Sequence, residues 1–187
     1  MTPAVPFPAW DDSLFALLNG RLHAAPLDAA MLGLTWLSTA KVGLALLIAA
    51  VFLAARGWRR PVAWVAALLA LGVDDLLVDR VVKRLVHRPR PLDAHLAVRA
   101  LVELRHSLGF PSAHAANSAA VAAVLLALGH RRAGWVCAAL SVWLGWSRVY
   151  VGVHRPLDVV GGWVIGAAVG WGVGLAARRY GARRGPA

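Results

Sequence analysis

Three short segments of the sequence carry residues that could bind an anion and do chemistry on it. In the first segment, Lys83 is followed seven residues later by Arg90, which lies between Pro89 and Pro91. A residue that precedes proline favours an extended backbone, so Arg90 is expected to leave the preceding helix in an extended approach. The two cations could then grip one anion between them.

The second segment, Phe110-Pro111-Ser112-Ala113-His114, opens a predicted helix. The unpaired N–H groups and the positive dipole end at a helix start form a ready site for phosphate. Ser112 can add a hydroxyl donor to this site, and His114 can supply a proton. We therefore expect the second segment to bind the same anion.

The third segment begins with Ser147-Arg148 and ends with His154-Arg155-Pro156-Leu157-Asp158. Proline suits the first position of a helix, so Pro156 predicts the start of the next one. Asp158, two residues further on, can turn back and accept a hydrogen bond from His154. A carboxylate in this position fixes the imidazole tautomer and supports its cationic form.

Together the three segments supply the parts for phosphoryl transfer. Cations and helix N–H groups would hold the equatorial oxygens, a histidine oriented by a carboxylate would attack, and a second histidine would protonate the leaving oxygen. This chemistry requires no metal ion and no other cofactor. Cys137 is the only cysteine, so the chain can form neither an internal disulfide nor a zinc site built from cysteines.

The elements that must position these residues are apolar helices. The chain has 187 residues, of which 59% are hydrophobic, and its mean hydropathy of +0.62 is too high for an ordinary soluble domain. A short amphipathic helix in the membrane interface is predicted from Trp10 to about Leu22. About five membrane spans should follow, within Leu27 to Ala55, from Pro61 to about Leu77 with a helical extension to Lys83, from Pro111 to Gly129, from Trp135 to Val153, and from Leu157 to Ala177.

These segments predict an all-α integral-membrane helix bundle formed by a single domain. Residues 1–26 would be the interfacial segment, 27–177 the transmembrane bundle and 178–187 a basic cytoplasmic tail. The first span is the least regular, because Ser38, Thr39 and Lys41 interrupt it, and it is expected to direct membrane insertion itself. Glycines in the last span suit close helix packing, namely Gly161, Gly162, Gly166, Gly170 and Gly174.

The net charge of +11 suggests an acidic partner: nucleic acid, an anionic lipid headgroup or a phosphate ester. Nucleic acid is disfavoured because the basic residues punctuate the apolar segments, as cytoplasmic ends of spans do. These residues are Arg56, Arg59, Arg60, Arg131, Arg132, Arg178, Arg179, Arg183 and Arg184. The positive-inside tendency then places the long loop from Arg88 to Phe110 and the turn at His154 outside the cytoplasm.

The three segments resemble, in order and spacing, the three signature motifs of the type 2 phosphatidic acid phosphatase family, whose members are membrane lipid phosphatases. The resemblance implies that His154 is the nucleophile, Asp158 its partner and His114 the general acid. It also implies phosphate binding by Lys83, Arg90, Ser112, the backbone at Ala113, and Arg148. Ala113 replaces the glycine usual in the second motif; its methyl group narrows the approach of a phosphate oxygen without removing the N–H donor.

Within this family the compact chain, with its short interfacial helix, is most similar to bacterial undecaprenyl-diphosphate phosphatases, which recycle the carrier lipid of cell-wall synthesis. The implied location is the bacterial cytoplasmic membrane, with the active site outside. Phosphatidic acid, phosphatidylglycerophosphate and lipid A or another glycolipid remain alternative substrates, because each presents a phosphate on an apolar stem. The oligomeric state is not predicted.

A membrane protein that only binds anionic lipid is the alternative from outside the enzymes. It would need neither of the histidines His114 and His154 nor the carboxylate of Asp158, and all three are present. A transporter would carry polar residues near the middle of several spans, whereas here they gather at one face.

Each cation in the motifs also has a simpler interpretation. Lys83 could pair within its helix with Asp79, four residues earlier, and Arg148 could pair with Asp79 or Asp158. Four residues flank the motifs and could contact a second phosphate, the rest of a headgroup or anionic lipid, namely Arg84, His87, Arg88 and Arg155.

Overall fold

The computed structural model describes residues 6–39, 61–94, 96–103 and 107–183. All regular secondary-structure elements in these ranges are helices. Outside the helices there is one isolated β-bridge, between Pro89 and Leu108. The elements are α1 (Ala9–Phe15), η1 (Ala16–Arg21), α2 (Ala25–Thr39), α4 (Pro61–Asp75), η2 (Leu76–Val82), α5 (Lys83–Val86), α6 (Ala113–Ala127), α7 (Arg131–Tyr150) and α8 (Pro156–Arg183). The predicted all-α fold is confirmed.

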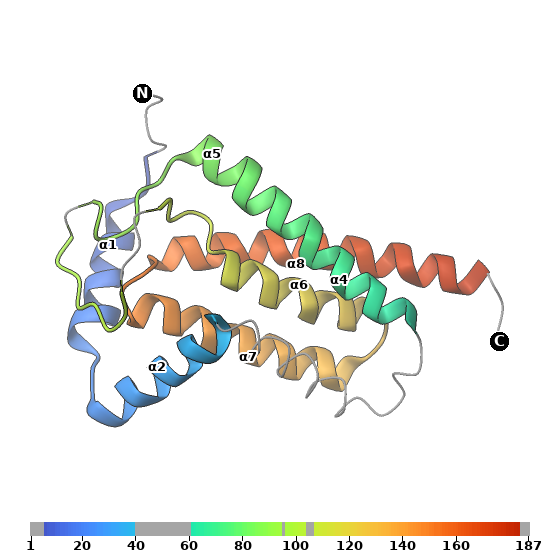
Figure 1. Cartoon of the computed structure of the whole chain (residues 1–187), viewed down its shortest axis with the longest axis horizontal. Coiled ribbons are helices and arrows are strands. Elements are labelled where there is room, and N and C mark those ends of the chain that lie inside the picture. Colours follow the sequence, from blue (N-terminus) through green and yellow to red (C-terminus); the bar gives the residue numbers. More distant parts are fainter. Residues whose placement is uncertain (1–5, 40–60, 95, 104–106, 184–187) are drawn as a thin grey trace.

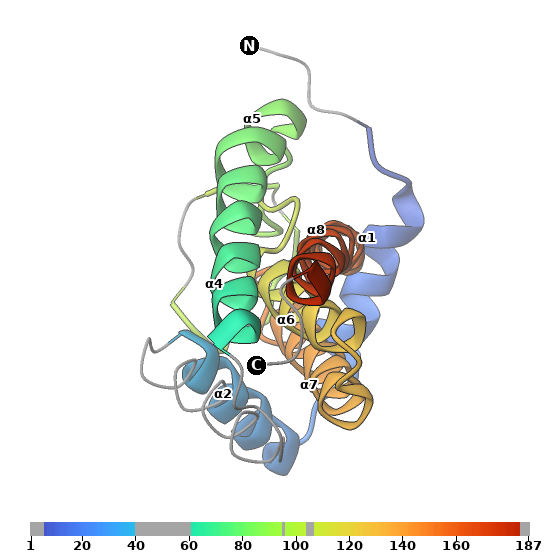
Figure 2. The same ribbon diagram turned by 90° about the vertical axis from the view of Figure 1, so that its right-hand side faces the viewer.

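Helix α6 is the centre of the bundle and packs against α4, α7 and α8 (Figures 1 and 2). Its buried face consists largely of alanine, including Ala116 and Ala120, which are both fully buried. Because alanine has a single methyl group, the neighbouring helices can approach the α6 backbone closely. The first turn of α6, which carries the second motif, is thereby fixed in position relative to the helices around it.

The contact between α6 and α8 depends on the absence of side chains from α8. A Cβ atom added at Gly166 would lie 2.0 Å from the carbonyl oxygen of Ala116, and one added at Gly170 would lie 2.2 Å from that of Ala120. Real Cβ atoms do not approach a backbone oxygen so closely, so only glycine fits at these positions. The close packing expected from the glycines of the last span is present.

The outer faces of the helices are apolar. Large exposed side chains include those of Leu68, Leu69, Trp135, Val142 and Val164. Within the described residues, the stretch of α8 from Pro156 to Gly181 is by length and composition a candidate membrane span, and α6 is a shorter apolar helix. A surface of this kind suits contact with hydrocarbon.

The observed helices follow the predicted segments with shifts at their ends. Helices α4, η2 and α5 form one continuous run to Val86, and α8 continues to Arg183, six residues beyond the predicted end of the last span. Arginine is a good helix former, so the basic end of this span stays helical. The predicted first span agrees with α2 as far as Thr39, and its remainder lies outside the described residues, as does the cluster of Arg56, Arg59 and Arg60.

The three motif segments meet at one end of the bundle, on the left in Figure 1. Helix α5 ends at His87, whose φ of 51° is left-handed and whose N–H donates to the carbonyl oxygen of Lys83. This cap turns the chain, so that the following residues cross the end of the bundle instead of extending the helix. The start of α6 and the turn between α7 and α8 lie at the same end, and α1 packs across it.

Candidate active site

The structure brings the predicted site residues of all three motifs together. His114, in the first turn of α6, lies close enough to Lys83, Arg90, Arg148 and His154 for their charges to act on it. Arg148 lies at the end of α7, and the turn that follows folds back onto it, since the N–H groups of Val153 and His154 both donate to its carbonyl oxygen. The arrangement concentrates positive charge around the start of α6.

Several buried polar atoms in this site have no hydrogen-bond partner. They are Oγ of Ser112, Nε and Nη1 of Arg148, and Nδ1 of His154; among the described residues, the other such atoms belong to Asp74, Arg99, Asn117 and Trp146. Ser112 is fully buried, and Arg148 and His154 are 6% and 2% exposed. A buried polar group without a partner is costly, and a buried cation more so. The donors of Ser112 and Arg148 therefore suit an anionic ligand.

The start of α6 adds backbone donors to these side chains. Ser112 is the N-cap residue, with an extended backbone (φ −75°, ψ 112°), but its hydroxyl makes no capping hydrogen bond. By helix geometry, the first N–H groups of α6, including that of Ala113, have no acceptor within the helix. Both the hydroxyl and the helix N–H groups can therefore donate to an anion, as the second motif predicts.

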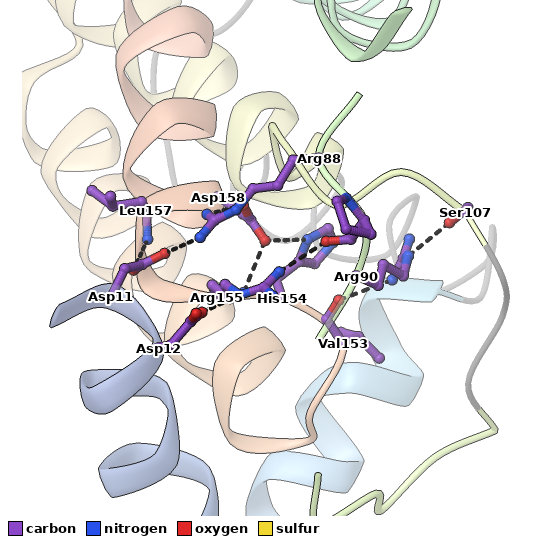
Figure 3. Close-up of polar contacts among 11 residues, drawn as sticks. Asp11, Asp12, Arg88, Arg90, Ser107, Val153, His154, Arg155, Leu157 and Asp158 are labelled. Carbon is purple, nitrogen blue, oxygen red and sulfur yellow. Dashed lines mark hydrogen bonds and ion pairs between the residues drawn. The ribbon is translucent and has the colours of Figure 1, made fainter. Parts of the chain in front are cut away.

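His154 is held neutral by its surroundings. It lies in the turn before α8, and burial lowers the pKa of its imidazole to about 4, although Asp158 acts in the opposite direction. Near pH 7 the ring is therefore unprotonated, which is the form in which an imidazole nitrogen is a nucleophile. Its Nδ1 lies 3.7 Å from Oδ2 of Asp158 (Figure 3).

This distance is longer than the hydrogen bond predicted between His154 and Asp158. The carboxylate of Asp158 already accepts two other hydrogen bonds, from Nη1 of Arg88 (2.7 Å) to Oδ1 and from the N–H of Arg155 (2.9 Å) to Oδ2. The two residues are thus neighbours as predicted, but without a hydrogen bond between them: Oδ2 of Asp158 accepts from the Arg155 N–H and lies near the neutral imidazole.

The two remaining cations differ in how they are held. Nε of Arg90 donates to Ser107 (2.6 Å) and Nη1 to the carbonyl oxygen of Val153 (3.2 Å), which ties the first motif to the third. Burial lowers the pKa of the Arg90 guanidinium from its ordinary value, and nearby Asp158 and Asp93 oppose this effect. Lys83 makes the expected ion pair with Asp79 (2.5 Å), so it would have to share or leave that carboxylate to bind an anion.

Two of the flanking arginines, Arg88 and Arg155, are already paired within the protein. Arg88 lies between Asp158 and Asp11, and Nε of Arg155 donates to Asp12 (2.5 Å) while its Nη1 donates to the carbonyl oxygen of Pro89 (Figure 3). Both guanidinium groups are buried and occupied. The physical reason is that α1 packs across this end of the bundle and supplies the carboxylates.

Asp11 and Asp12 are site residues that the sequence analysis missed. Both lie in the predicted interfacial helix from Trp10 to about Leu22, where carboxylates are expected to face water, yet Asp11 is fully buried. The available signal was their composition: two adjacent acids occur here in a chain with 9 acidic and 20 basic residues. Among the described residues, no three His, Cys, Asp or Glu side chains are grouped to hold a metal ion.

Fold and site thus describe a helical protein with apolar outer faces and a buried, cationic site in which a histidine lies beside an aspartate. The family model described as the PAP2 superfamily matches residues 63–181, and the chain belongs to this superfamily. The motif-based family prediction is confirmed, and the protein is a phosphatase that resides in a membrane and belongs to a lipid phosphatase family.

Relatives with different substrates match the chain. Undecaprenyl-diphosphatase BcrC of Bacillus subtilis is 29% identical over 159 residues, which span 84% of this chain and 79% of the relative. The lipid A 4'-phosphatase of Bacteroides thetaiotaomicron is 32% identical over 61% of this chain, and the match spans about half of that protein (54%).

Two solved structures share the fold. LpxE of Aquifex aeolicus has a TM-score of 0.72 and 28% identity, with 95% of this chain and 100% of that chain covered. The transmembrane PAP2-type phosphatidylglycerolphosphate phosphatase of Bacillus subtilis has a TM-score of 0.67 and 26% identity, with 94% and 86% covered. Both comparisons include the N-terminal helices as well as the residues matched by the family model.

Proposed function

We propose that this chain hydrolyses undecaprenyl diphosphate to undecaprenyl phosphate, without a metal ion and through a phosphohistidine at His154. The observation that carries the mechanism is the set of buried polar atoms without partners on Ser112, Arg148 and His154, gathered where positive charge is concentrated. The substrate proposal is supported by the similarity to undecaprenyl-diphosphatase BcrC, which extends over most of both chains.

In the first step, a ring nitrogen of His154 attacks the terminal phosphorus atom. Nδ1 lies toward Asp158, so Nε2 on the other side of the ring is the attacking atom. The bond from phosphorus to the bridging oxygen breaks. His114, whose protonated form is stabilised by the negative charge of the bound substrate, gives its proton to that oxygen. Arg148, Arg90 and Lys83, with the donors at the start of α6, stabilise the charge on the other phosphate oxygens.

In the second step, water replaces the imidazole on phosphorus. His114, now unprotonated, takes a proton from the water as the new oxygen–phosphorus bond forms and the bond to Nε2 breaks. Inorganic phosphate leaves, and both histidines return to their starting states. Asp158 supports the positive charge that the ring of His154 carries while it is phosphorylated.

We place the enzyme in the bacterial cytoplasmic membrane with its site facing outward, as one domain spanning residues 1–187. Two basic clusters support this orientation, because Arg131 and Arg132 at the start of α7 and Arg178 and Arg179 near the end of α8 lie at the end of the bundle away from the site (Figure 1). The contacts of Asp11 and Asp12 with the site support a single domain.

The alternative substrates rest on other relatives. The lipid A 4'-phosphatase and phosphatidylglycerophosphatase B are 32% and 35% identical to this chain over 61% and 53% of its length. All of these substrates present a phosphate on an apolar stem, so the phosphate site alone does not separate them. An assay with each lipid is therefore needed to identify the substrate.

The test is release of inorganic phosphate by the purified protein, in detergent with EDTA, from undecaprenyl diphosphate, phosphatidic acid, phosphatidylglycerophosphate and lipid A. We expect the fastest release from undecaprenyl diphosphate, a labelled phosphoenzyme during turnover, and loss of both in His154→Ala. Normal release by an intact His154→Ala protein would exclude the mechanism. Faster release from another lipid would replace the substrate and leave the mechanism in place.

A further inference from the structure

We propose that Asp11, in the N-terminal helix α1, is a positioning residue for catalysis that acts through Arg88 on the carboxylate of Asp158. The proposal rests on the proposed function, because it assigns to Asp158 the task of orienting His154. Asp11 touches no reacting atom; it would set the place and the charge of the group that does.

The contacts form an unbroken path from α1 to the nucleophile (Figure 3). Oδ2 of Asp11 accepts from Nη2 of Arg88 (2.5 Å), and Nη1 of the same guanidinium donates to Oδ1 of Asp158 (2.7 Å). The other oxygen of Asp158 lies 3.7 Å from Nδ1 of His154. One guanidinium therefore bridges two carboxylates, each through its own nitrogen.

Asp11 also holds the backbone next to Asp158. Its Oδ1 accepts from the N–H of Leu157 (2.9 Å), in the first turn of α8. A carboxylate at this place satisfies one of the unpaired helix N–H groups and opposes the positive end of the helix dipole. Asp11 thus fixes both the side chain and the backbone that carry the partner of the nucleophile.

The burial of these ions indicates positioning more than stability. Asp11 and Asp158 are fully buried, and Arg88 is 5% exposed. The guanidinium carbon of Arg88 lies 3.7 Å from the centroid of the Phe7 ring. Removing such ions from water costs several kcal/mol each, and an apolar replacement of a buried ionic group is often as stable or more so. The buried chain of ions from Asp11 through Arg88 to Asp158 is therefore better explained by a role in positioning the Asp158 carboxylate than by a contribution to stability.

The path leaves Asp158 poised near His154. With Oδ1 held by Arg88 and Oδ2 by the N–H of Arg155, the carboxylate cannot rotate freely. A shift of about 1 Å would bring Oδ2 within hydrogen-bond distance of Nδ1. This shift becomes favourable when the ring gains positive charge on phosphorylation, and the excess of two carboxylates over one guanidinium supports that charge.

The residue next to Asp11 provides a matched control. Asp12 lies on the same helix and makes an ion pair of the same length, 2.5 Å, but its partner Arg155 donates its other guanidinium bond to the carbonyl oxygen of Pro89. The side chain of Asp12 is 45% exposed. Both variants weaken the attachment of α1, but only Asp11→Asn alters a contact of the guanidinium that bonds to Asp158. Arg155, the partner of Asp12, reaches Asp158 through its backbone N–H and not through its guanidinium.

The experiment measures kcat, KM and the thermal unfolding midpoint of Asp11→Asn, Asp12→Asn and His154→Ala on the best lipid substrate. We expect Asp11→Asn to lower kcat about 10- to 100-fold, the usual effect of losing a residue that orients a catalytic histidine through its partner. Its KM should stay within about twofold, because the phosphate-binding cations are untouched. Asp12→Asn should keep kcat within about twofold.

Three outcomes would overturn the proposal: normal kcat in Asp11→Asn, equal losses of kcat in both variants, or a loss carried by KM alone. Should Asp11→Asn not fold, Phe7→Leu is the second variant. It leaves every ion pair in place and removes the ring that lies on the Arg88 guanidinium and packs against Phe110. It should lower kcat about 2- to 5-fold with KM unchanged, and normal kcat would overturn the proposal. Activity that survives in His154→Ala would instead contradict the proposed function.

Discussion

Two groups of buried polar side chains lie at the same end of the bundle and differ in how they are satisfied. The anchored cluster consists of Asp11, Arg88, Arg155 and Asp158, whose charges are paired with one another, with Asp12 or with backbone groups. The open cluster consists of Ser112, Arg148 and His154, each of which has at least one buried polar atom without a partner.

The difference separates groups whose charges are neutralised within the protein from groups with atoms left available to a ligand. Removing one partner from a buried ion pair leaves the other charge uncompensated, so variants in the anchored cluster should lose stability. Removing a buried polar atom that has no partner costs the folded state nothing and relieves an unsatisfied group. Variants in the open cluster should therefore lose activity and keep stability.

The largest effect on stability is expected from Arg88→Met in the anchored cluster. The substitution leaves the carboxylates of Asp11 and Asp158 facing each other in a buried site without a cation between them. Breaking a buried pair in this way costs about 3–5 kcal/mol of unfolding free energy. Thermal unfolding in detergent should show a lower midpoint than that of the wild type. An unchanged midpoint would contradict the expectation that variants in the anchored cluster lose stability.

The largest effect on activity at constant stability is expected from Arg148→Met in the open cluster. Loss of a donor that stabilises transition-state charge lowers kcat/KM by about 10²- to 10³-fold. The unfolding midpoint should be unchanged or higher, because an unpaired buried cation is removed. Orthophosphate or vanadate should raise the midpoint of the wild type but not of Arg148→Met. Unfolding as severe as that of Arg88→Met would contradict this prediction.

A smaller effect is expected from Ser112→Ala. Its hydroxyl makes no capping bond, so the variant should keep the wild-type midpoint, while loss of one hydrogen bond to phosphate lowers kcat/KM about 10-fold. Ser118→Ala on the same helix is the control. The Ser118 hydroxyl lies 2.7 Å from that of Ser141, so this variant should lose about 1 kcal/mol of stability and little activity.

A separate effect, on stability and not on activity, concerns its pH dependence. Burial lowers the pKa of His154 in the folded protein to about 4, whereas an unfolded histidine titrates near 6.5. The unfolded state therefore binds more protons between these values, so the stabilising contribution is complete above about pH 6.5 and is lost as pH falls through about 4. As pH falls from about 6.5 to about 4, the unfolding free energy of the wild type should therefore decrease relative to that of His154→Gln. A difference that does not change with pH would contradict the conclusion that the buried ring of His154 is neutral.

Much of the fold and the clustering of most residues of the candidate site could be predicted because they depend on local features. Apolar segments of sufficient length predict helices, and the motif residues lie at helix ends, where short spacings decide which side chains meet. His154 and Asp158 are one helical turn apart, and Lys83 and Asp79 are too, so their proximity follows from helix geometry. The glycines of α8 predicted a close contact, although not that α6 is the partner.

The anchored cluster was not predictable in this way. Asp11 and Arg88 are 77 residues apart, and Asp11 and Leu157 are 146 residues apart, so no local pattern relates them. The same acidic pair fits an interfacial helix facing water. Only the packing of α1 across the end of the bundle decides that Asp11 is buried.

The sequence by itself determined the described helices, the superfamily and the residues of the candidate site, because hydrophobic length and spacing along one chain are enough to specify them. Tertiary structure alone decided which of the basic residues are free to bind an anion. Arg88 and Arg148 have the same side chain, and they lie in the first and the third motif segment. They differ because carboxylates from distant segments neutralise one of them, while two nitrogens of the other, buried at the end of α7, are left without an acceptor.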